Sequence, residues 1–188
     1  MPPRPLCPAD VVSRTCQCSA PGAQREADRR LATPHNTNMP KEIERKFLVS
    51  GNGWRKRANR GKVIRQAYLA LTDTISLRVR IIGNTKAYIT VKSARFGATR
   101  SEFEYPIPLK DARALMKLRT GSVIEKRRYV VKVGKARYEV DVFKGKHLGL
   151  VIAEIELPTE QAGFERPVWL RKEVTGEKRY YNATLANP

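Results

Sequence analysis

The pattern of hydrophobic and polar positions changes at residue 39 of this 188-residue chain. Upstream, the sequence is rich in Pro, Ala, Arg, Ser and Cys and has the periodicity of neither strands nor helices. Downstream, apolar and charged residues alternate, as expected for strands that bury one face. We expect residues 1–38 to be a disordered extension, or sequence that precedes a natural start at Met39, and residues 39–188 to form the folded domain.

Eight downstream segments show this alternation, are enriched in Val, Ile, Tyr and Phe, and are separated by breaks that carry glycine. Apolar residues recur at helical spacing over 109–118 and near 180–185. Two short helices cannot cover eight strands, whereas a closed barrel leaves no strand edge exposed. The pattern therefore predicts an all-β dominated (α+β) fold, a closed eight-stranded antiparallel β-barrel with a few flanking helices. The predicted strands are 42–49, 63–70, 76–81, 86–92, 100–107, 126–133, 136–143 and 151–157.

Charged residues recur at every second position of these segments, so those of one strand share one face. Eight of the 18 acidic residues lie in four acid-x-acid pairs. On an ordinary sheet such a face is the solvated one, but here the acids are concentrated and the helices are too few to cover the sheet. We interpret the charged face as the lining of the barrel and the apolar face as its packed exterior. The sets are Glu42, Glu44 and Lys46; Arg78 and Arg80; Thr90 and Lys92; Glu102 and Glu104; Lys126 and Arg128; Glu139 and Asp141; and Glu154 and Glu156.

The formal charge of +19, from 37 Lys and Arg against 18 Asp and Glu, predicts an anionic partner. Nucleic acid is one candidate for this partner, and a small polyphosphate is the other. The first 38 residues contribute only +2, so the basic character belongs to the folded domain. Arg and Lys in a barrel lining need neutralisation, which carboxylates and a bound polyphosphate can share.

Paired carboxylates repel each other, and a divalent cation relieves that repulsion. All three cysteines lie within the first 18 residues and the chain has two histidines, so a zinc site is not expected. Oxygen ligands favour Mg²⁺ or Mn²⁺. The sequence lacks an apolar run of about 18 residues and a basic-then-apolar secretory pattern. We therefore expect a cytoplasmic protein without a membrane partner.

The segment Glu42-Ile43-Glu44-Arg45-Lys46 resembles the ExExK motif of the CYTH domain, the triphosphate tunnel metalloenzyme family. Further segments in the family's order extend the resemblance over residues 39–185, and the ordered set is far more specific than ExExK alone. The resemblance implies a closed eight-stranded tunnel. It also implies hydrolysis of inorganic triphosphate, thiamine triphosphate or nucleoside triphosphates, or cyclisation of ATP. The matching segments are 66–69, 77–80, 90–92, 102–105, 126–129, 139–143, 153–157 and 173–175.

The resemblance also implies roles for three groups of residues. The principal metal ion, Mg²⁺ or Mn²⁺, would be held by Glu42, Glu44 and Glu156, with further acidic positions at Glu104, Asp141 and Glu154. Phosphates would be bound by Lys46, Arg78, Arg80, Lys92, Lys126 and Arg128. The implied catalytic set is Lys126, Glu44 and Arg80. In this set Lys126 would act as the base for an attacking water or as its orienter, with its pKa lowered by the neighbouring Arg127 and Arg128.

Inorganic triphosphatase is the activity that we predict, because the chain shows no added module for recognising a base. Class IV adenylate cyclase is the first alternative. Thiamine triphosphatase is the second, since no aromatic clamp for thiamine stands out. A non-catalytic module that binds RNA or polyphosphate is the third, although a pure anion binder gains nothing from carboxylates in its groove. The expected partner is thus a small-molecule triphosphate rather than nucleic acid, and both a monomer and a homodimer fit the sequence.

Overall fold

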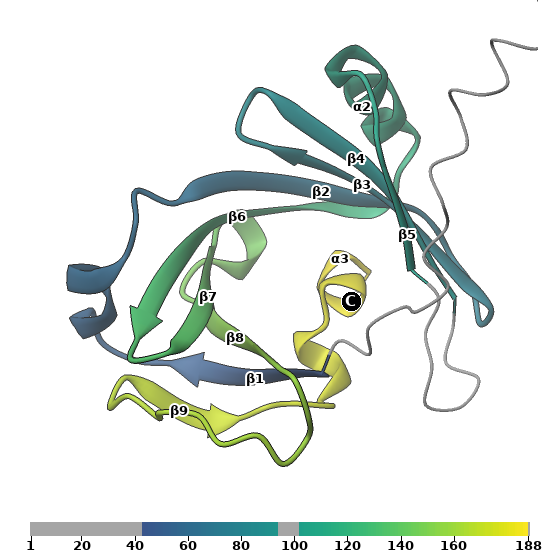
Figure 1. The fold of residues 1–188 in the computed structure, drawn as a ribbon. Helices are drawn as coiled ribbons and strands as arrows, with labels where there is room; N and C mark the ends of the chain where they lie inside the picture. The colour runs from purple at the N-terminus through teal and green to yellow at the C-terminus, as the bar shows by residue number, and fades with distance from the viewer. Residues whose placement is uncertain (1–42, 94–101, 188) are drawn as a thin grey trace, which may run out of the picture. The chain divides into compact units, whose positions relative to one another are not determined.

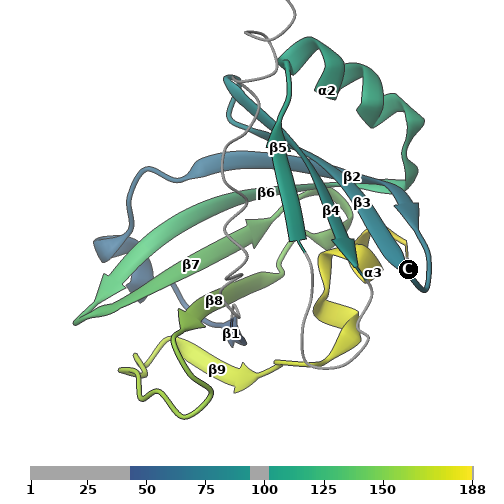
Figure 2. The ribbon, with the colours of Figure 1, turned by 45° about the vertical axis from the view of Figure 1, so that its right-hand side comes forward.

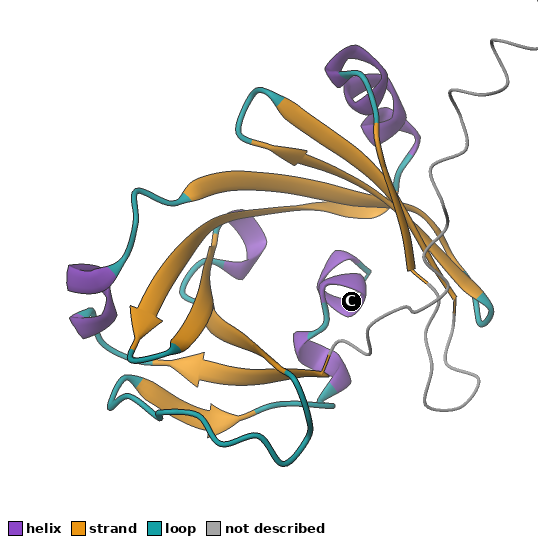
Figure 3. Cartoon of the chain, viewed as in Figure 1, coloured by secondary structure: helices purple, strands orange, loops and turns teal. Residues whose placement is uncertain are grey.

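The computed structural model describes residues 43–93 and 102–187, which form nine strands and a few short helices (Figure 3). The expectation for residues 1–38 lies outside this range, and so does Glu42, the first residue of the ExExK motif. The strands are β1 (Ile43–Val49), β2 (Lys62–Leu71), β3 (Ile75–Ile82), β4 (Lys86–Ser93), β5 (Glu102–Pro106), β6 (Thr120–Val133), β7 (Ala136–Phe143), β8 (Val151–Leu157) and β9 (Leu170–Glu173). The helices are α2 (Leu109–Leu115) and α3 (Asn182–Ala186), with 3-10 turns η2 (Gly53–Arg57), η3 (Met116–Leu118), η4 (Gly145–His147) and η5 (Lys178–Tyr180).

All strands belong to one antiparallel sheet in the order β5-β4-β3-β2-β6-β7-β8-β1-β9. The eight predicted strands are present, but the predicted number was wrong by one because β9 adds a ninth beside β1. In the part of the chain that the structure describes, β5 and β9 each have one neighbouring strand. The closed form of the barrel is therefore not observed in this part and stays a prediction.

The outer face of the sheet is apolar where β1, β6, β7 and β8 lie side by side. Phe47, Tyr138, Val140 and Ile155 are buried there in one core cluster. The aromatic rings that cover this cluster come from loops rather than from long helices, namely Trp54 in η2 and Trp169 just before β9. The interpretation that the apolar face packs outward is thus confirmed, and short segments suffice to cover it.

The two predicted helices are confirmed, and they cover opposite faces of the sheet. Helix α2 buries Ala112 against Val79, Ile81 and Ala87 on the outer face of β3 and β4 (Figure 2). Helix α3 instead lies inside the curve formed by β6, β7, β8 and β1 (Figure 1).

No helix among the described residues is both long enough and apolar enough to cross a bilayer.

A small apolar cluster anchors α3 to the inner face. Ala186 is buried there among Tyr68, Ile124, Phe143 and Ile152, which come from four different strands. The polar end of α3 is thereby held over the charged part of the same face. This end of the inner face is packed with apolar side chains.

Candidate active site

The register of the sheet places the predicted charged residues on one continuous face. Arg78 lies opposite Tyr68 on β2 and opposite Thr90 on β4, and Thr90 lies opposite Glu104 on β5. Because directly paired residues of neighbouring strands point to the same side, each row continues across the sheet. The other rows join Lys92 with Glu102, Gln66 with Arg80, Arg128 with Asp141, Glu139 with Glu154 and Lys46, and Glu44 with Glu156.

Acidic side chains gather on β7, β8 and β1. Glu44 and Glu156 lie directly opposite each other across β1 and β8, and Glu154 lies opposite Lys46 at the next pair on the same face. Burial and the charge of Glu154 raise the pKa of Glu44. A carboxylate whose pKa is raised by a second carboxylate is a group whose charged form a cation would stabilise.

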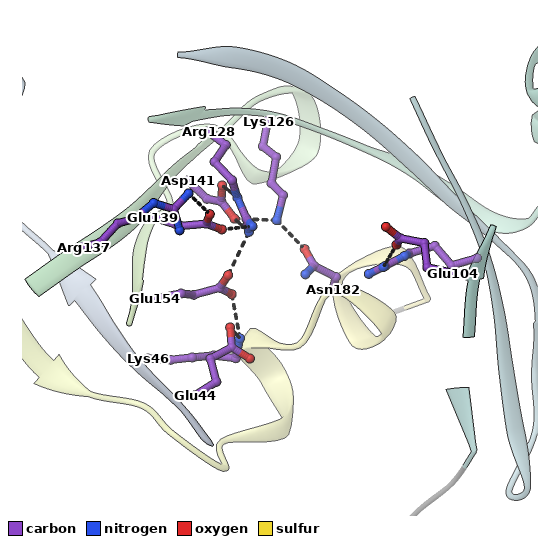
Figure 4. A network of polar contacts seen from close by, with 11 residues as sticks. Glu44, Lys46, Glu104, Lys126, Arg128, Arg137, Glu139, Asp141, Glu154 and Asn182 are labelled. Atoms are coloured by element: carbon purple, nitrogen blue, oxygen red, sulfur yellow. Dashed lines mark hydrogen bonds and ion pairs between the residues drawn. The ribbon is translucent and has the colours of Figure 1, made fainter. Parts of the chain in front are cut away.

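Glu154 connects the acids to the bases of the site (Figure 4). Its two carboxylate oxygens accept from Lys46 Nζ at 2.6 Å and from Arg128 Nη2 at 2.8 Å. Burial alone would raise the pKa of Glu154, but Lys46 and Arg128 outweigh burial and lower it. Lys46 Nζ also donates to Glu44 at 2.8 Å, so Lys46 links both acids.

Lys126 is deeply buried in this network, with 1% of its side chain exposed, and Asp141 is buried to the same extent. Its Nζ donates to Asp141 at 2.5 Å and to Asn182 of α3 at 3.2 Å, and lies 5.2 Å from the ring centroid of Phe143. Burial lowers the pKa of Lys126, and Asp141 opposes this effect. The lowering was expected from Arg127 and Arg128, whereas burial is its first cause, Arg128 contributes less, and Arg127 is not among the main causes.

Arg128 fixes the position of three carboxylates. It donates to both oxygens of Asp141, at 2.7 and 2.6 Å, as well as to Glu154 and to Glu139. Burial would lower the pKa of Arg128, but Asp141 and its neighbours raise it well above its usual value. Its charge is permanent, so Arg128 holds the acidic half of the site in one geometry.

Arg78 and Arg80 form the basic half on β3. Arg78 donates to the buried hydroxyl of Thr90 at 3.2 Å and lies 3.7 Å from Glu104. Arg80 forms no ion pair with any described residue, and its Nε is buried without a hydrogen-bond partner there. Burial, followed by the charges of Arg78 and Arg128, lowers the pKa of Arg80 to about 10. An arginine in this position favours an anionic ligand, which would replace the missing partner.

The far end of the face lies on the edge strands β4 and β5. Lys92 forms an ion pair with Glu102 at 2.5 Å, and Glu104 accepts from Thr90 at 2.9 Å. These residues share the face of the network around Arg128 but form no ion pair with it. The structure thus brings Lys46, Lys126, Arg128, Glu44, Asp141 and Glu154 into one network (Figure 4). Lys92 and Glu104 lie on a separate stretch of the same face.

Among residues 43–93 and 102–187, no three His, Cys, Asp or Glu side chains converge as a preformed metal site. Of the predicted metal-binding acids, Glu44, Glu104, Asp141 and Glu154 form ion pairs, and Glu42 is outside this range. The proposed ligands Glu44 and Glu156 nevertheless fit a hard cation, since they are adjacent carboxylates that share the face of the bases.

The site also contains four residues for which the sequence predicted no role. Glu139 accepts from Arg128 and Arg137, and Thr90 joins Arg78 to Glu104. Asn182 comes from α3, and Gln66 is fully buried opposite Arg80. Period two placed Glu139 and Thr90 on this face without giving them a role, but no local pattern marks Asn182 or Gln66.

The model of the CYTH domain family matches residues 40–185, and the chain belongs to this family. An inorganic triphosphatase of Acetivibrio thermocellus is 46% identical over 152 residues, covering 80% of this chain and 96% of the relative. An inorganic triphosphatase of Nitrosomonas europaea is 38% identical over 149 residues, covering 77% and 96% of the two chains. The crystal structure of an inorganic triphosphatase superposes with a TM-score of 0.60 at 36% identity, covering 79% of this chain and 95% of that one.

Gly121 lies against the C-terminal end of α3, the helix that carries Asn182. Its φ is +70°, and a Cβ at this position would lie 2.5 Å from the carbonyl oxygen of Ala186. We expect Gly121→Ala to destabilise the protein by about 1–2 kcal/mol through left-handed backbone strain and to expose the C-terminal segment to proteolysis. Urea unfolding and limited proteolysis measure the two effects.

The matched control is Gly163→Ala, because Gly163 has an ordinary φ and open space around it. We expect this change to stay within about 0.5 kcal/mol of the parent. Equal stability and equal protease resistance of both variants would contradict the contact between Gly121 and the end of α3.

Proposed function

We propose that this protein is a metal-dependent triphosphatase that converts inorganic tripolyphosphate to diphosphate and phosphate. The observation that carries the proposal is the division of one face into an acidic half and a basic half that contains Arg80 without a carboxylate partner. The names of the two curated relatives support the same reaction and the same substrate class.

We propose Glu44 and Glu156, together with Glu42, as the ligands of the principal ion, with Glu104, Asp141 and Glu154 as further acidic positions. Mg²⁺ or Mn²⁺ suits this set because all of its donors are carboxylate oxygens. When bound, such an ion neutralises phosphate charge and orients its oxygens. The repulsion that raises the pKa of Glu44 would be relieved by the same cation.

The bases would then hold the phosphate chain. Arg78, Arg80 and Arg128 offer fork-shaped donors for phosphate oxygens, and Lys46 and Lys92 offer compact positive charges. Closure of the sheet into a barrel belongs to this proposal, because a ring of strands would set Lys92 and Glu104 across one lumen from Glu44 and Lys46. Residues 39–188 would form this domain, and the cytoplasm stays the predicted location.

The reaction would be an in-line attack by water on a terminal phosphorus. Arg80 and Arg78 would stabilise the negative charge that spreads over the phosphoryl oxygens. Lys126 would accept a proton from the water or orient it, and the pKa that burial lowers suits the first role. Asp141 and Asn182 keep its Nζ in place through their hydrogen bonds.

Phosphate release from tripolyphosphate, with Mg²⁺, Mn²⁺ or EDTA, tests the proposal. We expect release only with a divalent ion, and we expect Glu44→Ala to reduce it by about 10²-fold or more, the scale set by losing one group that stabilises transition-state charge. Glu160→Ala is the matched control, because Glu160 is exposed after β8. Absence of metal-dependent phosphate release would contradict the proposal. Formation of cyclic AMP from ATP would instead show that the protein is an adenylate cyclase.

Salt-sensitive RNA binding that Glu44→Ala leaves unchanged would instead favour the non-catalytic binder, since such binding depends on Lys and Arg and not on carboxylates. Circular dichroism of each variant separates loss of function from loss of fold.

A further inference from the structure

The Gln66 amide is the most unusual polar group of the site. The residue is fully buried, and neither its Nε2 nor its Oε1 has a hydrogen-bond partner among the described residues. Leaving a buried donor and acceptor unpaired costs about 1–3 kcal/mol each, and such groups in native proteins call for an explanation. An apolar residue of similar size would avoid this cost, so the amide has no structural advantage at this position.

The sheet register places Gln66 between two groups of the proposed reaction. On one side it lies directly opposite Arg80 of β3, whose Nε is likewise buried without a partner. On the other side its direct partner is Ile124 of β6, and Lys126 is the next residue of β6 on the same face. Gln66 is thus a direct neighbour of the phosphate-binding Arg80 and a diagonal neighbour of Lys126.

We infer that Gln66 positions the attacking water, an inference that rests on the proposed triphosphatase function. Its Oε1 accepts a hydrogen bond from the water and its Nε2 donates to an oxygen of the terminal phosphoryl group, which Arg80 also binds. A side-chain amide can make both contacts at once, and a glutamine that orients the attacking water is an established device in phosphoryl transfer. Water and phosphate together satisfy the groups that the protein leaves unpaired.

In the proposed hydrolysis, the water oxygen forms a bond to the terminal phosphorus while the bond from this phosphorus to the bridging oxygen breaks. The bonding electron pair leaves with diphosphate, one water proton remains on the new phosphate, and the other passes to an oxygen of the departing diphosphate. Gln66 neither gains nor loses a proton, so its contribution is one of position.

Gln66→Met tests this inference, because it keeps the length of the side chain and removes both polar atoms. We expect kcat for tripolyphosphate to fall by about 10²-fold, the size of effect that misplacing a reacting group produces, with KM changed less than about threefold because Arg78 and Arg80 remain. We also expect the midpoint of thermal unfolding to stay equal or rise, since an unpaired buried amide is replaced by an apolar side chain.

Gln66→Glu separates the two contacts, as it keeps an acceptor and loses the donor. We expect it to raise KM as well, because a carboxylate would face the phosphate. Gln161→Met is the control, since Gln161 is exposed in the segment after β8 and should change nothing.

Full activity of Gln66→Met beside an active parent would overturn the role of Gln66 and leave the triphosphatase proposal standing. A parent that releases no phosphate with either metal would overturn both. A lower unfolding midpoint with unchanged kcat would identify Gln66 as a packing residue and also overturn the inference.

Discussion

Asp141→Ala is expected to lower the free energy of unfolding by about 3–5 kcal/mol, the cost of removing one partner from a buried ion pair. The Asp141 carboxylate is 1% exposed and accepts from Lys126 and Arg128 together. Within the described part of the chain, its loss leaves Lys126 Nζ with one hydrogen-bond partner, the amide oxygen of Asn182, and the ring of Phe143 nearby. Urea unfolding at neutral pH measures the change through the transition midpoint at constant slope.

The control for this prediction is Glu125→Ala, which removes the exposed ion pair to Lys144 and should cost less than about 1 kcal/mol. The double variant Asp141→Ala with Lys126→Met should recover part of the loss, because the unpaired charge is then absent. A cost below about 1 kcal/mol for Asp141→Ala alone would contradict the central position of this pair.

Arg80→Met is expected to have the second large effect, this time on activity. We expect kcat/KM for tripolyphosphate to fall by about 10²–10³-fold, as when a donor that stabilises transition-state charge is removed. Stability should hold or rise, because the guanidinium is buried and its Nε has no partner within the described part of the chain. Steady-state kinetics together with thermal unfolding measure both effects.

Arg80→Lys should retain part of the activity because the positive charge stays. The rest should be lost because lysine lacks the two parallel N–H donors of the guanidinium. Arg113→Met on the exposed surface of α2 is the control and should leave kinetics unchanged. If Arg80→Met loses stability and keeps its activity, the guanidinium is a structural group and the proposed phosphate contact is wrong.

The strands and the charged face were predictable from sequence because both depend on a local period of two. Lys46, Arg78 and Arg128 point to one side whatever their neighbours are, provided that each lies in a strand. Strand β9 was not predictable in the same way, since a four-residue segment is too short to show a period. Its place beside β1 depends on contacts such as the ion pair between Arg45 and Glu173.

The partners within the site were not predictable, because they depend on strand order. Nothing local in the sequence indicates that Lys46 meets Glu154 or that β2 lies between β3 and β6. Gln66 was given no role, although it begins the matching segment 66–69, because a single uncharged polar residue in a strand adds nothing to the charge pattern. Its significance appears only when its hydrogen-bond partners are counted.

The pairing of β1 with β8 and β9 has a consequence for how the protein is made. The β2–β3–β4–β5 meander joins strands that are neighbours in sequence, so its contacts can form while the rest of the chain is still being synthesised. Lys46 and Glu154 are 108 positions apart, so β1 has no strand to pair with until β8 and β9 leave the ribosome. Such long-range closure slows folding. The last strands added during translation therefore complete both the sheet and the acidic half of the site.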